Sequence, residues 1–470
     1  MNSMNNTNIF ISHESRGQGV TGASDSEVQL TLSASQNTLY LTNLMSEIAS
    51  LATLKSAFKA VKRNKGAPGI DNISVNEVSQ NLDVILEQLS ADLLDGSYRP
   101  CPVRGVVIPK DNGKTRQLGI PTVCDRIVQQ SIASVLGKIY DPTFSDSSYG
   151  FRTKRCANMA IKAASKYVQD DRIWCVDIDL EQFFDKVNHD VLMSKLAKTI
   201  ADKPLLRLIR RFLTVGLMQD GLIKARAQGA PQGGPLSPLL SNILLDSLDK
   251  ELEKRGHKFC RYADDCNIYV KSEAAGIRVM ASITKFLKAR LKLTVNQDKS
   301  AVALVQNRQF LGFRILNNAD VTISKTALKK IKGKIRILTK RNRGISLVQL
   351  VKELNQVITG WYHYFKDTKS KSLMRELDCW IRRRIRCFKL KQRKRKYPIK
   401  TMLASMGISQ QNAWSVACSK CGWWGKSLNY VVHRAMNLDW FTKIGLFSLS
   451  LAFGKHNSKT AVCDIACTVV

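Results

Sequence analysis

The stretch Tyr262-Ala263-Asp264-Asp265 is the most informative part of this 470-residue chain. The two acidic residues lie between hydrophobic runs at 258–261 and 267–270, which predicts a β-hairpin with both carboxylates at its tight turn. Adjacent carboxylates repel each other and are costly to bury unless a cation lies between them. A site rich in Asp and poor in His favours hard cations, and a pair of Mg²⁺ ions is the usual solution. The alternative interpretation is a surface turn that happens to contain two Asp residues.

A third carboxylate is predicted upstream of this hairpin. Apolar and acidic residues alternate from Val176 to Leu180, which favours a strand that ends in an exposed carboxylate just before a helix. Asp179 from this strand would complete a two-metal site with Asp264 and Asp265. In such a site one ion activates an attacking 3′-hydroxyl, while the other holds a triphosphate and stabilises the leaving oxygen. The chemistry that this arrangement predicts is in-line phosphoryl transfer.

Seven motifs in a fixed order make roughly residues 40–455 resemble the reverse transcriptases of bacterial group II introns. They are GAPGID (66–71), IPK with RQLGIP (108–110 and 116–121), YGFR (149–152), DLEQFFD (179–185), GAPQGGPLSP (229–238), YADD (262–265) and FLGF (310–313). The resemblance implies an α+β fold of the right-hand polymerase type, with helical fingers, an antiparallel-sheet palm and an α-helical thumb. A small C-terminal maturase/DNA-binding region is expected to follow the thumb.

The formal net charge of +35 predicts a polyanionic partner, and nucleic acid is the first candidate. The alternative is a soluble protein that is merely basic. Positive charge is concentrated between Ile323 and Lys400, where there are 25 Lys and Arg residues but only 4 Asp and Glu residues. No signal peptide is recognised, and no apolar run approaches the roughly 20 residues that span a bilayer. We therefore expect a cytoplasmic protein without a membrane partner, whose twelve cysteines are reduced.

Charge and periodicity divide the chain into five expected segments. They are a mobile leader (1–38), the reverse transcriptase fingers and palm (39–322), a basic helical thumb or maturase domain (323–400), a C-terminal maturase/DNA-binding region (401–455) and a tail (456–470). Only 17 residues remain after Phe453, too few for the metal-bound nuclease domain of many relatives. The resemblance therefore implies the endonuclease-lacking class.

Helices and strands can be assigned coarsely within these segments. Before the palm, helical patterns are expected at 39–65, 72–94 and 121–140, and a strand at 104–109 is followed by a turn at 111–113. In the basic segment, three long helices are expected at 324–342, 347–366 and 372–396. Basic helices that contact phosphates need no sequence readout, which suits an enzyme that slides along its template.

The resemblance assigns the metal ligands residue by residue. Asp179 and Asp264 would be the main ligands of two Mg²⁺ ions, and Asp265 would support them. Asp177 is the alternative to Asp179, because it lies on the same face of the predicted strand. We favour Asp179, since Phe184 then lies five residues on, where the family places an aromatic ring beneath the incoming sugar. Such a ring would clash with a 2′-hydroxyl and select deoxynucleotides, although core packing is the alternative for one of the two neighbouring Phe residues.

Other residues match nucleotide-binding positions of the family. Lys110 and Arg116 would bind the triphosphate, where cations offset developing charge. Gln232, in a glycine-rich loop, would contact the incoming nucleotide, since its neighbouring glycines allow close backbone approach. Lys299 corresponds to a Lys of the palm near the nucleotide, although a surface Lys is the alternative. Arg152 would either contact the template or organise the fingers.

A zinc site is a separate hypothesis. Cys418 and Cys421 have the spacing of half a zinc site, and Cys463 and Cys467 follow in the tail. The second pair is spaced by three residues and lies in a hydrophobic segment. Unrelated cysteines are therefore the preferred interpretation.

Three functional interpretations follow. The first is an RNA-directed DNA polymerase encoded by a group II intron, which binds the intron RNA, assists its splicing and copies it by target-primed reverse transcription. Its expected partners are intron RNA, a template RNA with a DNA primer, target DNA and deoxynucleoside triphosphates, and it acts as a monomer or a homodimer. The second is a free-standing reverse transcriptase in host defence or repair. The third is an RNA-binding splicing factor with a decayed polymerase site.

Two groups of residues discriminate between these interpretations. Intact Asp179, Asp264 and Asp265 argue against decay of the polymerase site. Gly422-Trp423-Trp424 and the motif at 445–449 resemble the maturase-associated region of the family, which other bacterial reverse transcriptases usually lack. These motifs favour the intron-encoded protein over the free-standing enzyme.

Overall fold

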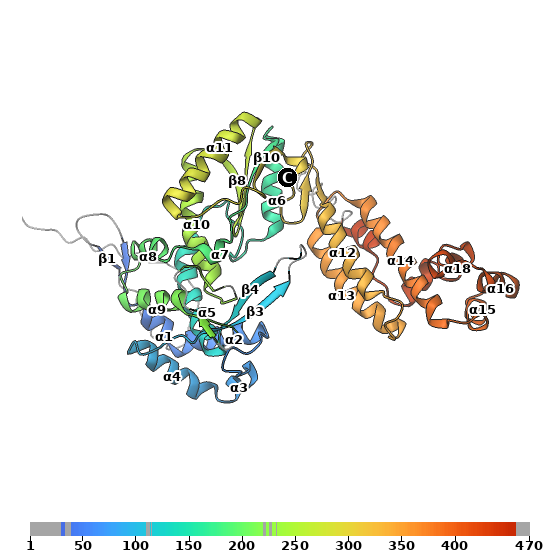
Figure 1. The fold of residues 1–470 in the computed structure, drawn as a ribbon, viewed down its shortest axis with the longest axis horizontal. Coiled ribbons are helices and arrows are strands. Elements are labelled where there is room, and N and C mark those ends of the chain that lie inside the picture. The colour runs from blue at the N-terminus through green and yellow to red at the C-terminus, as the bar shows by residue number, and fades with distance from the viewer. Residues whose placement is uncertain are drawn as a thin grey trace, which may run out of the picture.

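The computed structural model describes residues 30–32, 39–109, 113, 115–219, 222–224, 228–231 and 233–456. Residues 39–304 form a broad body, and residues 325–443 form an arm of helices that extends from it (Figure 1). Helices coexist in the body with an antiparallel sheet and with a mixed sheet in which β3 and β6 pair parallel, whereas the arm is helical, so the predicted α+β class is confirmed. Most of the expected leader and tail lies outside the described residues.

Five helices form one end of the body. They are α1 (Leu44–Ala49), α2 (Leu51–Arg63), α3 (Val75–Gln80), α4 (Leu82–Leu94) and α5 (Val123–Tyr140). The helix predicted at 121–140 is confirmed as α5, whose first turn is capped by the Thr122 hydroxyl accepting from Asp125 N.

Two predicted helices are wrong in extent. The helix expected at 39–65 begins as strand β2 (Leu39–Leu41) and breaks at Ser50, whose hydroxyl accepts from Thr53 N at 3.3 Å and starts α2. The helix expected at 72–94 breaks at Asn81, after the short α3 that Ser74 and Glu77 begin with a capping box. Capping side chains end a helix locally even where the apolar period continues across the break.

A four-stranded sheet, in the order β4-β3-β6-β7, lies beside these helices. Its strands are β3 (Val103–Pro109), β4 (Thr115–Ile120), β6 (Leu217–Gln219) and β7 (Leu222–Lys224). The predicted strand at 104–109 is confirmed as part of β3, whereas most of the predicted turn at 111–113 lies outside the described residues. A further strand, β1 (Leu30–Leu32), lies in the segment expected to be a mobile leader and pairs antiparallel with β2.

The palm sheet has the order β10-β5-β9-β8 and is antiparallel throughout, as predicted. Its strands are β5 (Trp174–Ile178), β8 (Lys258–Tyr262), β9 (Asp265–Val270) and β10 (Ala301–Leu304). Three short helices connect β5 to the loop before β6 and β7: α7 (Phe183–Lys186), α8 (His189–Ala197) and α9 (Lys203–Thr214).

Helices cover both faces of the palm sheet. Side chains alternate along β5, so Val176 packs into one core with α10 (Ser237–Lys254) and α11 (Glu273–Phe286). Cys175 packs into a second core with α6 (Ala157–Gln169). Asp177 and Asp179 continue the second face beyond the buried part of the strand, so their carboxylates can reach an open cleft.

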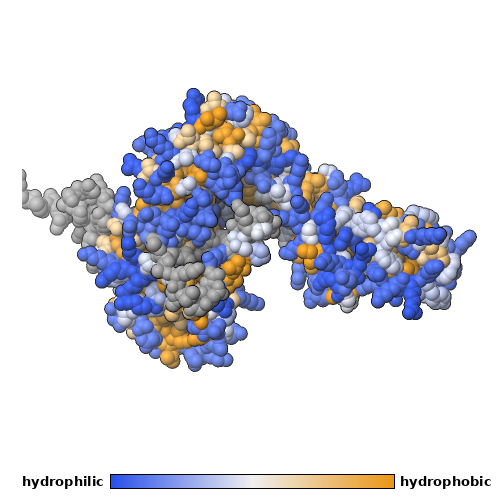
Figure 2. Space-filling model, viewed as in Figure 1, coloured by the Kyte–Doolittle hydropathy of each residue, from blue (hydrophilic) through white to orange (hydrophobic). Residues whose placement is uncertain are grey.

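The arm contains the three basic helices predicted from the sequence, α12 (Lys325–Leu338), α13 (Leu347–Phe365) and α14 (Lys371–Arg393). A hairpin of β11 (Phe313–Ile315) and β12 (Val321–Ile323) connects them to the palm. Phe313 is buried in this joint, with its ring centroid 4.8 Å from that of Phe365. In Figure 2 hydrophilic side chains cover much of the arm, as its charge predicts.

Five short helices follow: α15 (Lys396–Ser405), α16 (Gln410–Cys418), α17 (Trp423–Lys426), α18 (Tyr430–Ala435) and α19 (Leu438–Lys443). The chain then runs back to α14, where buried Asp378 accepts from Leu449 N and Ser450 N at 3.0 and 2.9 Å. A carboxylate at the start of the final helical segment, 449–456, satisfies its free N–H groups. Among the described residues, no helix is both long and apolar enough to cross a membrane.

Candidate active site

The predicted hairpin is confirmed. Strands β8 and β9 pair antiparallel with Tyr262 opposite Asp265, so Ala263 and Asp264 form a two-residue turn. Ala263 has a φ of 59°, a conformation that is uncommon for residues other than glycine. The turn therefore needs support from neighbouring residues, and Gly150 packs so closely on it that an added Cβ would lie 2.2 Å from Ala263 N.

Strand register brings Asp179 beside this turn. Ile178 lies opposite Cys266 on β9, so the next residue on each strand is Asp179 and Asp265. The Asp179 amide donates to Ser300 Oγ at 2.9 Å, and the Asn296 amide donates to the Asp179 carbonyl at 2.9 Å. These bonds fix the end of β5, so the structure brings the three predicted carboxylates to one edge of the palm sheet.

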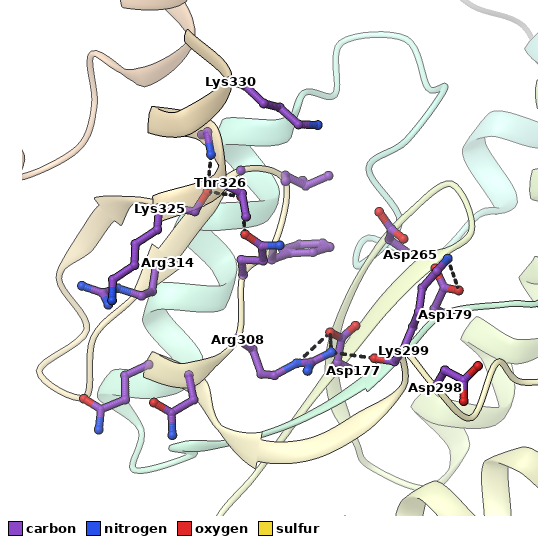
Figure 3. A pocket seen from close by; sticks show the side chains of 18 residues that line it. Asp177, Asp179, Asp265, Asp298, Lys299, Arg308, Arg314, Lys325, Thr326 and Lys330 are labelled. Atoms are coloured by element: carbon purple, nitrogen blue, oxygen red, sulfur yellow. Dashed lines mark hydrogen bonds and ion pairs between the residues drawn. The ribbon is translucent and has the colours of Figure 1, made fainter. Parts of the chain in front are cut away.

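Two cavities meet at this edge. The thumb-side cavity, of about 860 Å³, has Asp177, Asp179 and Asp265 on one wall (Figure 3). Basic side chains of the β11 strand and the first turns of α12 line it as well, namely Arg314, Lys325 and Lys330. The fingers-side cavity, of about 900 Å³, is lined by Asp264, Phe184 and residues of β4. Asp179, Asp265 and Lys299 line both cavities.

Within the cluster, Asp265 is the carboxyl group whose charged form is least favoured. Partial burial, and then repulsion from Asp264, Asp177 and Asp179, raises the pKa of Asp265 to about 7, although part of its side chain is open to solvent. Lys299 Nζ lies 2.9 Å from Asp179 Oδ2. Around Asp265, the repulsion from the three neighbouring carboxylates therefore outweighs the attraction of Lys299, the cation that favours its charged form.

Asp177, the alternative ligand, is bound by Arg308. The Arg308 Nε donates to Asp177 Oδ2 at 2.9 Å, and Nη2 makes a second, very short contact with the same oxygen. Arg308 Nη2 also donates to the Lys299 carbonyl at 2.8 Å, which ties the Lys299 backbone to the palm strand (Figure 3). Both bonds go to one oxygen of Asp177, and Arg308 is less exposed than Lys299, the cation that pairs with Asp179. Lys299 is therefore the easier of the two cations to displace, which makes Asp179 the better candidate ligand.

The donor set suits a hard divalent cation, because it consists of carboxylate oxygens that repel one another. Among the described residues, however, no three His, Cys, Asp or Glu side chains are already gathered closely enough to hold one ion. The Lys299 ammonium is the present partner of Asp179 Oδ2. A cation that binds Asp179 would therefore compete with Lys299 for this carboxylate.

The two neighbouring Phe residues differ in exposure. Both line the fingers-side cavity, but Phe183 is buried in the core whereas Phe184 is half-buried. Their rings meet edge to face with centroids 5.2 Å apart. The glycine-rich loop crosses close by, since Ala230 N donates to the Phe184 carbonyl at 2.6 Å and an added Cβ on Gly229 would meet that oxygen at 2.9 Å.

Several predicted site residues cannot be placed. Lys110 and Gln232 lie outside the described residues, and only the backbone of Arg116 is described, within β4. Cys463 and Cys467 also lie outside them, and no described group of three suitable side chains includes Cys418 or Cys421. The described part of the chain thus adds no third zinc ligand to Cys418 and Cys421.

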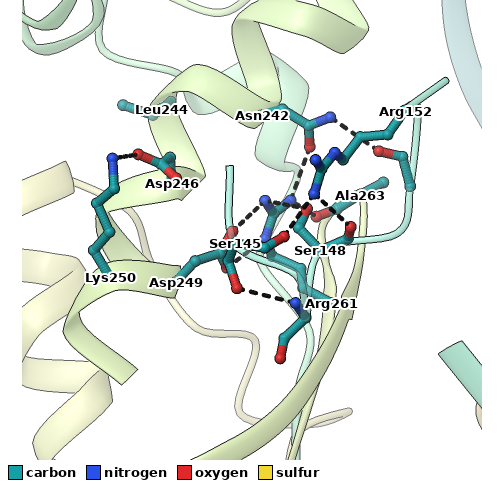
Figure 4. Close-up of polar contacts among 12 residues, drawn as sticks. Ser145, Ser148, Arg152, Asn242, Leu244, Asp246, Asp249, Lys250, Arg261 and Ala263 are labelled. Carbon is teal, nitrogen blue, oxygen red and sulfur yellow. Dashed lines mark hydrogen bonds and ion pairs between the residues drawn. The ribbon is translucent and has the colours of Figure 1, made fainter. Parts of the chain in front are cut away.

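Sequence reasoning missed the residue that supports the catalytic hairpin, Arg261. Its side chain is fully buried and pairs with equally buried Asp249 of α10, Nε to Oδ1 at 2.7 Å and Nη2 to Oδ2 at 2.5 Å (Figure 4). The other guanidinium hydrogens go to Asn242 Oδ1, Ser148 Oγ and the Ala263 carbonyl, at 2.8 to 2.9 Å. All five donors of the group are therefore satisfied, and one of them holds the turn.

The sequence did carry a signal for this network. Arg261 falls within the hydrophobic run 258–261, and Asp249 follows Leu248 at the end of the apolar part of α10; both positions suggest buried charges, which occur almost only in pairs. Asn242 extends the network, since its Nδ2 donates to the Gly150 carbonyl at 2.9 Å. Arg152 lies beside it and donates to Asp141 Oδ1 and the Ser145 carbonyl at 2.8 and 2.6 Å, so it organises this loop.

Comparisons with known proteins agree with this architecture. The model of the family "Reverse transcriptase (RNA-dependent DNA polymerase)" matches residues 108–315, and that of "Group II intron, maturase-specific domain" matches residues 328–404. Protein YkfC of Escherichia coli (strain K12) is 32% identical in an alignment of 327 residues, and the match covers 61% of this chain and 86% of that protein.

The chain matches a smaller part of two intron-associated proteins. Group II intron-encoded protein LtrA of Lactococcus lactis subsp. cremoris is 27% identical over 370 residues, 64% of this chain and 60% of that protein. The putative COX1/OXI3 intron 2 protein of Saccharomyces cerevisiae is 28% identical over 320 residues, 65% of this chain and 36% of that protein. The matches thus span less than two thirds of both of these relatives.

Proposed function

Since this chain belongs to the family of group II intron reverse transcriptases with a maturase-specific domain, we propose that it copies the RNA of its own intron into DNA and assists the splicing of that RNA. The observation that carries the polymerase part is the convergence of Asp179 from β5 with Asp264 and Asp265 from the hairpin turn. The third interpretation, a splicing factor without catalysis, is disfavoured because this cluster is intact.

We assign the roles of the cluster by charge and position. Asp179, Asp264 and Asp265 would hold two Mg²⁺ ions, which would supply activation of the primer 3′-hydroxyl and stabilisation of the leaving pyrophosphate. Lys299 pairs with Asp179 and lines the fingers-side cavity, where its ammonium would contact a triphosphate oxygen. Arg308 keeps Asp177 neutralised throughout.

The remaining nucleotide contacts rest on the family resemblance. Lys110 and Arg116 would bind the triphosphate, and Gln232 the incoming nucleotide. Strand β4 reaches the fingers-side cavity through Thr115 and Gln117, and the assignment of Arg116 rests on the resemblance alone. The template–primer duplex would then lie against the thumb-side cavity, where Arg314, Lys325 and Lys330 can contact phosphates without reading sequence.

Selection of deoxynucleotides provides a test of the fingers-side cavity. We expect Phe184→Val to raise the preference for ribonucleotides by at least about tenfold, because the ring beneath the sugar no longer excludes a 2′-hydroxyl. The measurement is kcat/KM for single-nucleotide primer extension on an RNA template with each triphosphate. Phe183→Leu is the matched control: Phe183 lines the same cavity, but its side chain is buried in the core, so its replacement should leave the ratio unchanged. Equal ratios in both variants would exclude a selective role for Phe184.

Target-primed reverse transcription would use a nicked target DNA as the source of the primer. The alternative function, a free-standing reverse transcriptase of host defence or repair, shares the catalytic cluster and differs only in its RNA partner. The maturase-specific match over 328–404 favours the intron-encoded protein.

The bound RNA discriminates between the two functions. We expect the protein, isolated from its host after crosslinking, to enrich a structured transcript that contains its own reading frame. The basic helices of the arm should hold that transcript, because phosphate contacts dominate RNA affinity. Sequencing of the RNA that copurifies checks this. Enrichment of a short unrelated transcript, with the reading-frame transcript at background level, would instead identify a free-standing enzyme.

A further inference from the structure

A separate cavity lies in the arm, between the loop at 339–342, helix α14 and helix α17. Its volume is about 740 Å³, and it shares no lining residue with the two cavities at the carboxylate cluster. The residues that define its chemistry are Lys340, Arg341, Arg384, Lys391, Trp423 and Trp424. Polymerisation gives none of the six a role, and the general attraction of the basic helices for phosphates does not explain the two Trp residues.

The cavity gathers positive charge. Four of its described lining residues are cationic and none is acidic. Arg384 is held in place by bonds from Nε to Thr339 Oγ1 at 2.7 Å and from Nη2 to the Arg336 carbonyl at 3.2 Å. Arg384 therefore caps the C-terminal end of α12, while Lys340 and Arg341 are exposed at the rim. Converging cations without balancing acids favour a phosphate group as the ligand.

The cavity also offers aromatic faces held in position by cations. The Arg383 guanidinium carbon lies 3.7 Å from the ring centroid of Trp424, and Arg383 Nη2 donates to the Trp424 carbonyl at 3.3 Å. Lys391 Nζ lies 5.3 Å from the ring centroid of Trp423. These contacts fix the two indoles while Trp424 keeps 37% of its surface exposed. A large exposed indole at a basic cavity is a platform for a flat, electron-rich ring.

We propose that this cavity binds an unpaired nucleotide, with the base stacked on the exposed indole of Trp424 and the flanking phosphate held by Lys340, Arg341 and Lys391. A duplex supplies phosphates but keeps its bases stacked inside, so it would leave the aromatic faces unused. An unpaired nucleotide satisfies both features of the cavity. Only the source of the nucleotide, intron RNA or target DNA, rests on the proposed function.

The test uses the full chain and single-stranded dodecamers that carry one photoactivatable base, 4-thiouridine in RNA and 4-thiothymidine in DNA. After irradiation, the crosslinked peptides are mapped by mass spectrometry. We expect a crosslink at 339–342, 384–391 or 423–424, in addition to crosslinks in the polymerase cleft. A crosslink at the cavity with RNA only would indicate that the nucleotide comes from the intron, and one with DNA only that it comes from the target DNA. A duplex of the same sequence should not crosslink at the cavity.

Two variants decide whether stacking holds the nucleotide. Trp424→Leu should lower the yield at this site about tenfold, the size expected for the loss of one stacked base, and leave the cleft crosslinks unchanged. Trp414→Leu is the control, because Trp414 is similarly exposed at 45% but does not line the cavity. Lys340→Gln removes one cation at the exposed rim. It should lower the slope of log yield against log salt concentration by about one, and it leaves the packing of both indoles unchanged.

Three outcomes would overturn the proposal. They are no crosslink at the cavity, an equal crosslink with the duplex, or an unchanged yield in Trp424→Leu. Primer extension is measured on the same preparations. If the unaltered protein crosslinks at the cavity but does not extend a primer, only the polymerase function is contradicted. If it extends a primer but does not crosslink at the cavity, only the nucleotide site is contradicted.

Discussion

The double variant Asp264→Ala, Asp265→Ala is expected to lose primer extension by at least about a thousandfold, while its affinity for RNA stays within the error of the wild type. The two carboxylates lie at the hairpin turn beside Asp179, and their removal takes away most of the ligands of the proposed metal pair. Several kcal/mol of charge stabilisation in the transition state correspond to a loss of this size. Single-turnover extension of a DNA primer on an RNA template, with filter binding of the RNA in parallel, measures both quantities.

A matched control comes from the same cleft. Asp298 lines both cavities and is exposed, but it is not one of the proposed ligands. Asp298→Ala should therefore reduce extension far less, although it removes a carboxylate at a similar location. Near-normal extension by the double variant would disprove the site assignment, and a parallel loss of RNA binding would show that the hairpin serves binding instead.

The second large effect is expected at Arg261. Arg261→Met should lower the free energy of opening of the palm sheet by about 3–5 kcal/mol, because it leaves the Asp249 carboxylate buried without its partner. Amide hydrogen exchange at β8 and β9 measures this free energy locally. Arg210→Met is the control, since Arg210 pairs with Asp190 on the surface, where such pairs stabilise little.

A further variant separates stability from geometry. Adding Asp249→Leu to Arg261→Met removes the stranded charge and should restore much of the lost stability, since apolar pairs often replace buried ion pairs at little cost. Extension should nevertheless remain about a hundredfold low, because the Ala263 carbonyl loses its donor and a shift of about 1 Å in the turn misplaces Asp264. Wild-type extension by this restored variant would show that Arg261 contributes stability only.

Local patterns explain which parts of the fold were predictable. The hairpin at 258–270, the strand before Asp179 and the three basic helices each carry their own period and turn residues, so the sequence predicts them directly. The N-terminal helices were predicted too long, because a single capping residue such as Ser50 ends a helix without interrupting the apolar period.

The candidate site was predictable in its chemistry but only partly in its geometry. The identity of Asp264 and Asp265 follows from their sequence context. The preference for Asp179 over Asp177 had rested on resemblance, and an independent reason for it comes from Arg308, which binds Asp177 from a position 131 residues away. No periodicity connects residues so distant in the chain.

The sequence by itself determined the acidic hairpin and the basic character of the arm, since each depends on side chains that are neighbours along the chain, and its motifs implied the polymerase architecture through the family resemblance. Only the tertiary structure decided how the charges are paired: Arg261 with Asp249, Arg308 with Asp177, and Lys299 with Asp179. It alone also decided which of the two Phe residues is buried and that Trp424 lines a cavity with the basic loop after α12. The physical reason is that a charge in a low-dielectric interior must find its partner in space, and the packing of distant segments sets that distance.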